Sequence, residues 1–276
     1  MMPPTSIDGT DITGATIDGT EVQEITVDGD TVFTAVPPTA PVNRMYVADF
    51  INGLVRQYDL TNKFDLTGAT QTGSLSTSEP MDVNIADSGN RLVVSDRSLN
   101  RHEMYSLSTP YDVDSAGIVT STLGETDAHG IDIDPSGVNV ITGNINSSEF
   151  RYYTLGTPFD FNTATLQDSE GVGDGTYDID YVKQGEYVYG TTKFQAYRWE
   201  LTTPFDFTTR TNIQTYSIET EYRGIHVTND GSKYLAAYYA DGEVYEYNLS
   251  TPYDITSRGN AVDTFNAPNS IGLDLV

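Results

Sequence analysis

Five polar residues occupy one position in five short, otherwise largely apolar segments, and these residues are Asn84, Asp132, Asp180, His226 and Asp274. If the segments lie side by side, their side chains form a ring. Three carboxylates in such a ring repel one another unless they are hydrated, hydrogen-bonded or bridged by a cation that accepts oxygen ligands. A water-filled polar channel and a bound Ca²⁺, Na⁺ or K⁺ both satisfy the pattern, and the cation would involve Asp132, Asp180, His226 and Asp274.

A second group of carboxylates lies in the glycine-rich stretch 168–175, which contains Asp168, Glu170 and Asp174. This stretch could bind calcium, but it lacks the full spacing of a calcium-binding hand. Solvated surface charge is the alternative interpretation. The sequence therefore requires no cofactor, although a Ca²⁺ or a monovalent cation fits either group.

Nothing else in the chain has the spacing of a catalytic centre. There is no phosphate-binding loop, no Ser-His-Asp arrangement can be placed, and the three histidines lack the spacing of a zinc site. We therefore expect a protein that is not an enzyme.

The segments that carry the ring belong to a repeat. A phrase of an aromatic residue, Leu two residues later and a closing aromatic-Asp pair returns five times. The closing aspartates, which lie 47, 48, 46 and 48 residues apart, are Asp65, Asp112, Asp160, Asp206 and Asp254. A period in the mid-forties with short alternating strands is typical of a β-propeller that has one four-stranded blade per repeat.

The repeat also predicts how the ring closes. The innermost strand of a fifth blade, 270–276, ends the chain, and no further strands follow it. The missing strands stand at the front, at 44–50, at 54–60 and after Asp65. We therefore predict an all-β fold in which residues 43–276 form a five-bladed propeller closed by the C-terminal strand, which removes open sheet edges.

The first residues form a separate module. Asp-Gly turns recur every ten residues and predict hairpins over residues 1–35, and a proline-rich linker follows at 36–42. So few apolar residues cannot form a core of their own. A disordered tail is one interpretation. We favour an attachment or oligomerisation segment that adds strands to a partner and buries Ile17, Val22, Ile25, Val27, Val32 and Phe33.

Charge limits the possible partners. Forty acidic residues against fourteen basic ones give a net charge of −26. This balance suits either an acidic surface protein or a halophilic protein in which molar salt screens the self-repulsion. It disfavours binding to nucleic acid, because phosphate would be repelled. The chain has no apolar run of membrane length, so we expect no membrane insertion.

Recognition is expected in the loops that vary from blade to blade, since the turns of the opposite face repeat and are predicted to be scaffold. The candidate ligand-binding residues in these loops are Arg97, Asn100, Arg101, His102, Asn144, Asn146, Phe194, Tyr238, Tyr239 and Asp241. The first of them include a basic cluster of Arg97, Arg101 and His102. That cluster is either local charge balance or an anchor for an acidic glycan or protein. Both chain ends of the propeller are predicted on the scaffold face.

Two stretches resemble known families. The string Ile17-Asp18-Gly19-Thr20 and the residues that follow it, as far as Val27-Asp28-Gly29, resemble N-terminal segments of virion structural proteins from tailed phages and haloarchaeal viruses. The blade phrase Leu249-Ser250-Thr251-Pro252-Tyr253-Asp254 resembles propeller repeats of phage-borne and marine bacterial surface proteins. The innermost strand and its turn more distantly resemble YVTN- and NHL-type propellers.

The resemblance implies a protein of the virion surface, such as a spike, a fibre head or a capsid decoration. Residues 1–35 would attach it to other virion proteins or to copies of itself. The propeller would bind a glycan or a protein of the host surface. The alternative is a cellular extracellular propeller that is lectin-like or binds matrix.

Overall fold

The computed structural model describes residues 43–218, 222–267 and 269–276, and in addition four short N-terminal strands. Within residues 1–42, which form a unit separate from residues 43–276, β1 (Ser6–Ile7) pairs with β2 (Thr10–Asp11) and β3 (Glu24–Val27) pairs with β4 (Asp30–Thr34). The predicted attachment residues Ile17 and Val22, and the linker 36–42, lie outside the described residues. Ile25 and Val27 belong to β3, and Val32 and Phe33 belong to β4.

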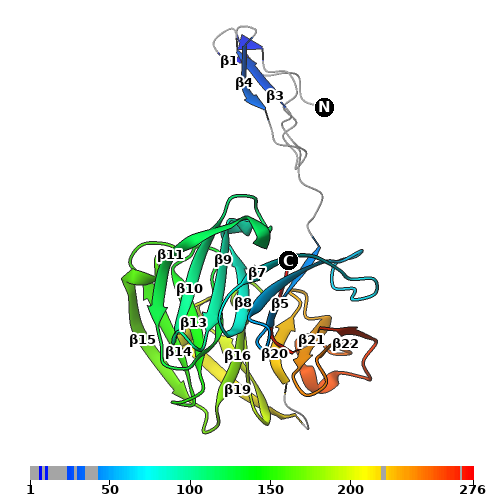
Figure 1. Cartoon of the computed structure of the whole chain (residues 1–276). Helices are drawn as coiled ribbons and strands as arrows, with labels where there is room; N and C mark the ends of the chain where they lie inside the picture. Colours follow the sequence, from blue (N-terminus) through cyan, green and yellow to red (C-terminus); the bar gives the residue numbers. More distant parts are fainter. Residues whose placement is uncertain are drawn as a thin grey trace. The chain divides into compact units, whose positions relative to one another are not determined.

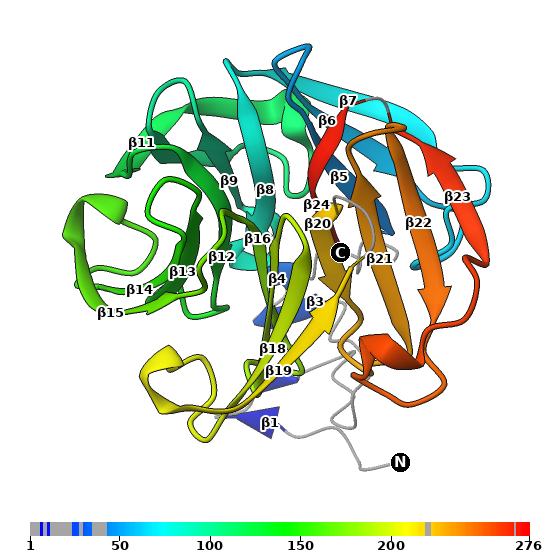
Figure 2. The same cartoon turned by 90° about the horizontal axis from the view of Figure 1, so that it is seen from below.

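Residues 43–276 fold into five four-stranded antiparallel sheets arranged around a central axis (Figure 2). The second blade comprises β8 (Pro80–Ala86), β9 (Arg91–Asp96), β10 (Arg101–Leu107) and β11 (Ala116–Gly124), and the third comprises β12 (Ala128–Ile133), β13 (Asn139–Asn144), β14 (Glu149–Leu155) and β15 (Ala164–Gly171). The fourth blade comprises β16 (Thr176–Val182), β17 (Tyr187–Thr192), β18 (Gln195–Leu201) and β19 (Arg210–Ser217). The fifth blade comprises β20 (Tyr222–Val227), β21 (Lys233–Tyr238), β22 (Glu243–Asn248) and β23 (Asp263–Asn266). The five-bladed all-β propeller is thereby confirmed.

The first blade joins the two ends of the propeller, as the repeat predicts. The C-terminal strand β24 (Ser270–Leu275) pairs antiparallel with β5 (Arg44–Asp49), and β6 (Leu54–Asp59) and β7 (Thr70–Ser76) complete the sheet (Figure 2; β5 and β7 are also labelled in Figure 1). Backbone hydrogen bonds join Arg44 N to Val276 O at 3.3 Å and Val276 N to Arg44 O at 3.1 Å. The described residues contain no helix that is long and apolar enough to cross a membrane.

The core lies between the blades. The aromatic that opens each repeated phrase is buried in all five blades, at Tyr58, Tyr105, Tyr153, Trp199 and Tyr247. Tyr153 of the third blade packs with Val93 and Met104 of the second, and Trp199 of the fourth packs edge-on against Phe150 of the third, with ring centroids 5.2 Å apart. Inter-blade burial of aromatic surface therefore holds the ring together.

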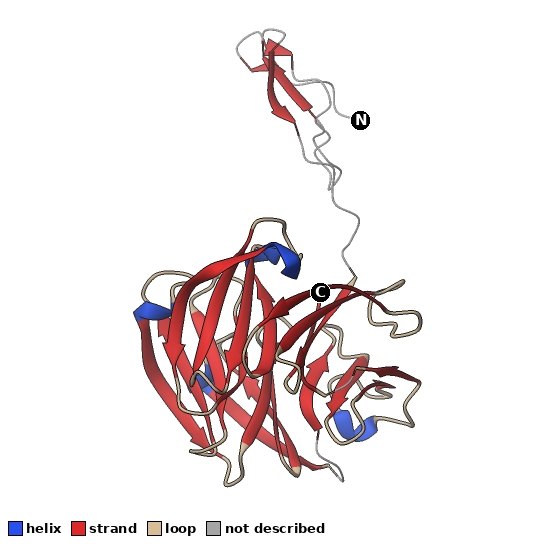
Figure 3. Cartoon of the chain, viewed as in Figure 1, coloured by secondary structure: helices blue, strands red, loops and turns tan. Residues whose placement is uncertain are grey.

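The closing aromatic-Asp pair builds one rim of the propeller. In all five blades the aromatic has a positive φ, 57° at Phe159 for example, and in four of them the Asp side chain caps a short 3₁₀ turn (Figure 3). The Phe159 N–H donates to Gly137 O of the turn between the two inner strands at 2.9 Å. A Cβ on Gly137 would lie 2.5 Å from the Phe159 ring, so only glycine fits there. This contact explains why the phrase recurs.

Candidate functional site

The innermost strands β8, β12, β16, β20 and β24 line the axis of the propeller, and among the described strands each of them has one edge without a neighbour. Backbone N–H groups on such an edge need other acceptors. Asp132 supplies them, since Oδ1 accepts from Ile133 N and Oδ2 from Tyr181 N of the next blade, both at 2.7 Å. Asp274 likewise accepts from Ile85 N of the second blade at 2.7 Å. The predicted ring therefore connects neighbouring blades.

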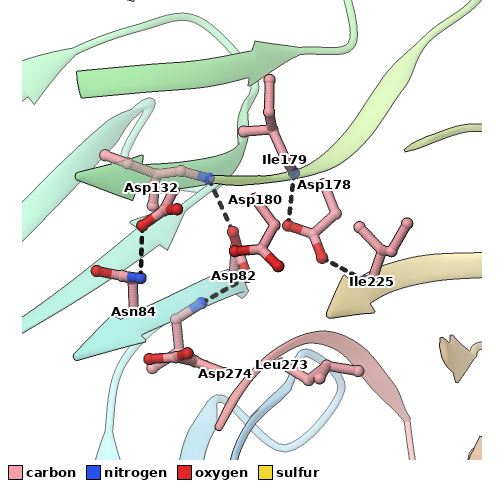
Figure 4. Close-up of a pocket in the computed structure, with 11 residues that line it drawn as sticks. Asp82, Asn84, Asp132, Asp178, Ile179, Asp180, Ile225, Leu273 and Asp274 are labelled. Atoms are coloured by element: carbon pink, nitrogen blue, oxygen red, sulfur yellow. Dashed lines mark hydrogen bonds between the residues drawn. The ribbon is translucent and has the colours of Figure 1, made fainter. Parts of the chain in front are cut away.

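A second layer of carboxylates lies deeper in the channel. Asp82 accepts from Val83 N at 2.8 Å and from Ile131 N at 2.7 Å, and Asp178 accepts from Ile179 N at 2.7 Å and from Ile225 N at 2.6 Å (Figure 4). Sequence reasoning missed this layer. A sequence pattern could have revealed it. In each innermost strand, the residue two positions before the ring residue is Asp in two blades and Gly in the other three.

The glycines at this deeper level allow the strands to approach closely. A Cβ on Gly130 would lie 2.6 Å from Asp178 Cα, closer than real Cβ contacts. The two carboxylates therefore fit only because their neighbours lack side chains.

Burial controls the charge of both layers. Loss of water raises the pKa of Asp132 to about 8, that of Asp178 to about 7 and that of Asp274 to about 6. Burial also raises the pKa of Asp82 and Asp180 well above the usual range and lowers that of His226 to about 4. Partial protonation relieves the repulsion in the channel, and His226 is neutral at pH 7.

A pocket of about 470 Å³ opens above the ring. Its floor is the ring itself, and its walls come from the turns between the two inner strands, from the closing aromatic of the fourth blade and from the chain end. The lining residues are Asn84, Ile85, Asp132, Ile133, Pro135, Asp180, Tyr181, Gln184, Gly185, Phe205, His226, Asn229, Asp274, Leu275 and Val276. The pocket therefore lies on the face that the repeat predicts to be scaffold.

No set of three or more His, Asp or Glu side chains in the described part of the chain is arranged to hold a metal ion. The predicted cation at Asp132, Asp180, His226 and Asp274 therefore stays a prediction. In the stretch 168–175, Arg210 binds both Asp168 and Glu170, the latter at 2.7 Å. A guanidinium thus occupies two of the three carboxylates of the candidate calcium loop, and Asp174 accepts from Gly175 N.

The structure corrects the prediction of a ligand-binding role for His102 and Asn144. Both side chains are fully buried. His102 is a residue of β10 rather than of a loop, and Asn144 ends β13, where its amide donates to Thr126 O and its carbonyl accepts from Ser147 N. Arg97 pairs with Glu79 at 3.1 Å and Arg101 with Glu103 at 2.5 Å, so the basic cluster is balanced locally.

His102 belongs to a buried Ser-His-Glu arrangement that sequence reasoning did not find. Its Nδ1 lies 2.7 Å from Ser95 Oγ and its Nε2 lies 2.8 Å from Glu125 Oε2. Ser95 and His102 face each other across the hairpin, a relation that no spacing rule marks. All three side chains are buried, and Glu125 also binds Arg151. A hydroxyl without access to substrate is structural, not nucleophilic.

The remaining predicted loop residues reach the surface to different extents. Asn100, Asn146, Asp241 and Phe194 are exposed, with Phe194 58% accessible. Tyr238 and Tyr239 are half-buried. Tyr239 packs against Phe50 and under the Arg223 guanidinium, which lies 3.9 Å from its ring centroid. The tyrosines therefore contribute to packing, and only part of their surface can meet a ligand.

Comparison with known proteins shows the fold. No protein-family model matches the sequence, and no curated protein matches it. A solved protein of unknown function from Desulfotomaculum acetoxidans superposes with a TM-score of 0.56 at 11% identity, covering 85% of this chain and 88% of its own. A Lactobacillus plantarum protein superposes with a TM-score of 0.52 at 16% identity, covering 93% and 83%.

A Bacteroides fragilis protein described as a "putative 6-phosphogluconolactonase" also superposes, with a TM-score of 0.52 at 11% identity, covering 86% of this chain and 71% of its own. At such identities the likeness is one of architecture. This chain therefore has a β-propeller fold.

Proposed function

We propose that this chain is a protein of the virion surface (a spike, a fibre head or a capsid decoration) whose propeller recognises a glycan or a protein on the host. Residues 1–35 attach it to other virion proteins or to copies of itself. The observation that carries the proposal is the division of the chain. Residues 43–276 close their own ring through β24 and β5, and residues 1–42 form a separate unit.

A self-closed propeller needs nothing from residues 1–42 for its fold. The paired strands of that unit, β1 with β2 and β3 with β4, fit a segment that adds strands to a partner. The exposed side chains of Asn100, Asn146 and Phe194 fit recognition by loops on a rigid frame.

The arrangement of the side chains also favours binding over catalysis. The Ser95–His102–Glu125 arrangement is buried. The name of the Bacteroides fragilis protein specifies a lactone that carries a phosphate. In the pocket of this chain a phosphate would be repelled by the carboxylates of Asp132, Asp180 and Asp274, and the lining residues include no Lys or Arg that could bind it. We therefore propose that the chain is not an enzyme of that kind.

Localisation and blocking test this proposal together. Antibody against residues 43–276 is expected to label extracellular particles by immunogold microscopy, and the isolated propeller is expected to block adsorption of those particles to host cells. A Phe194→Ser propeller should block less well, with Ile118→Ser, on an exposed site of the outer strand β11, as its matched control. Label on cell envelopes and none on particles would replace the proposal with the extracellular alternative.

A further inference from the structure

The pocket above the ring has properties that neither blade closure nor display requires. Its volume of about 470 Å³ is that of a small-molecule site and far exceeds that of a bare ion. Its lining combines an acidic floor with aromatic and aliphatic walls. Such a lining suits a ligand that has a charged end and an apolar body.

Two acceptors on the floor are incompletely satisfied. Asn84 Oδ1 is buried and accepts no hydrogen bond from any described residue, while its Nδ2 donates to Asp132 at 2.8 Å. Asp180 accepts one long bond, 3.3 Å from Val227 N. Buried acceptors of this kind call for a donor. A ligand group that reaches Asp180 from the pocket must therefore carry N–H or O–H donors.

The sign of the charge follows from the neighbours. His226 Nδ1 lies 3.5 Å from Asp180 Oδ2 and 4.0 Å from Asp274 Oδ1, so the two carboxylates converge on one point of the floor. The residues that line the pocket include no Lys or Arg, and the cation whose charge acts on His226 and Asp274 is the exposed Lys63. Where these carboxyls are ionised, an anion would be repelled and a cation would be attracted.

The shape of the acceptors selects the kind of cation. A guanidinium binds best to a carboxylate that offers both oxygens. On this floor, backbone N–H groups occupy both oxygens of Asp132 and one oxygen of Asp180, and Asp274 accepts from the backbone N–H groups of Ile85 and Leu275. An ammonium has three donors that can reach single oxygens on different blades. Tyr181 and Phe205, with ring centroids 5.2 Å apart, form a wall for an aliphatic stem.

We propose that this pocket binds a primary ammonium group carried on a short aliphatic stem, supplied either by a free alkylamine or by a lysine side chain of a protein partner. The ammonium donates to Asp180 and Asp274, and the stem lies along Tyr181 and Phe205. This inference is independent of the virion proposal, because it rests on the described propeller alone.

Calorimetric titration of the full chain with n-butylammonium tests the proposal. Saturable binding is expected, with n-butanol and n-butylguanidinium at least about tenfold weaker, since the first lacks the charge and the second lacks a bidentate partner. Nα-acetyl-lysine N-methylamide separates the two sources. Equal affinity for it means that a protein-borne lysine can enter, and its failure to bind assigns the site to a free amine.

Charge variants on exposed side chains keep the test independent of folding. Gln184 lines the pocket at an exposed turn, and Gln184→Lys is expected to weaken n-butylammonium binding about threefold while Gln184→Glu strengthens it. Lys63→Gln, which removes the nearby cation, should strengthen it by a similar factor. Glu186→Gln, an exposed change in the same turn outside the lining, is the control for attraction to the acidic surface.

The direction of the pH dependence is a further readout. Because the pKa values of the lining residues Asp132 and Asp274 are raised to about 8 and about 6 while an alkylammonium stays charged, affinity should rise across that range. His226 is neutral throughout it, because burial lowers its pKa to about 4. Absence of saturable binding up to about 10 mM, equal binding of n-butanol, or no response to the Gln184 and Lys63 variants would overturn the proposal.

Discussion

Removing the Asp178 carboxylate should destabilise the propeller more than its single side chain suggests. Asp178 is 1% exposed and accepts from Ile179 N at 2.7 Å and from Ile225 N, in the next blade, at 2.6 Å. Asp178→Ala leaves both N–H groups buried without an acceptor. Each unsatisfied group costs about 1–3 kcal/mol, so the free energy of unfolding should fall by about 2–6 kcal/mol.

The effect also depends on pH, and its sign can be worked out. Burial raises the pKa of Asp178 to about 7, above the value of about 3.9 in an unfolded chain. A raised carboxyl pKa contributes stability that is complete below pH 4 and is lost as pH rises through the folded pKa. Between pH 6 and 8 the wild-type protein therefore loses about 1 kcal/mol through this group, and the cost of Asp178→Ala shrinks by the same amount.

Urea unfolding at pH 6 and pH 8 measures both quantities. Asp241→Ala is the control, because Asp241 is exposed and its loss should cost about 0–1 kcal/mol. Asp178→Asn keeps one acceptor oxygen and should lie between the two. If Asp178→Ala at pH 6 changes the free energy of unfolding by less than about 1 kcal/mol with an unchanged m-value, the carboxylates do not connect the blades as argued.

Three further outcomes are expected. As pH rises from 6.5 to 8, the urea midpoint of the whole protein should fall. Burial raises the pKa of Asp132 to about 8 and that of Asp178 to about 7, so in this range the folded state binds more protons than the unfolded state. A midpoint that rises with pH contradicts this. Molar KCl should raise the thermal midpoint above that in dilute buffer, since salt screens the self-repulsion of a chain of net charge −26; a flat response would remove the halophilic interpretation. Deleting residues 1–40 should leave a folded monomer that no longer joins its assembly, as judged by light scattering, and persistent assembly would move the attachment site to the propeller.

The architecture was predictable because every blade repeats its own folding signals. The aromatic at Tyr105 or Trp199 and the closing aromatic-Asp pair each perform one local task, and the task recurs with the period. Closure followed from counting strands, since 270–276 has no partner except a strand at the front of the chain. The ring position was predictable for the same reason.

The features that the sequence did not reveal depend on contacts between strands. Whether a residue near a strand end faces the core depends on where pairing begins, and His102 pairs with Ser95 one residue into β10. The Asp82 and Asp178 layer depends on glycines in neighbouring blades. The pocket depends on how far the turn at Gln184 and the Phe205 ring stand above the ring, which no alternation pattern encodes.

The asymmetry of the ring links the scaffold to recognition. If all five positions held Asp, five equivalent carboxylates would surround the axis, and a bound cation would have no preferred direction. Asn84 replaces one carboxylate with an amide that donates to Asp132 and leaves Oδ1 without a partner, and His226 replaces another with a ring that is neutral at pH 7 because burial lowers its pKa to about 4. Both replacements reduce repulsion among the carboxylates of the ring. Asn84 and His226 are therefore the two positions of the ring at which the repeat departs from Asp, and both border the pocket proposed to bind an ammonium group.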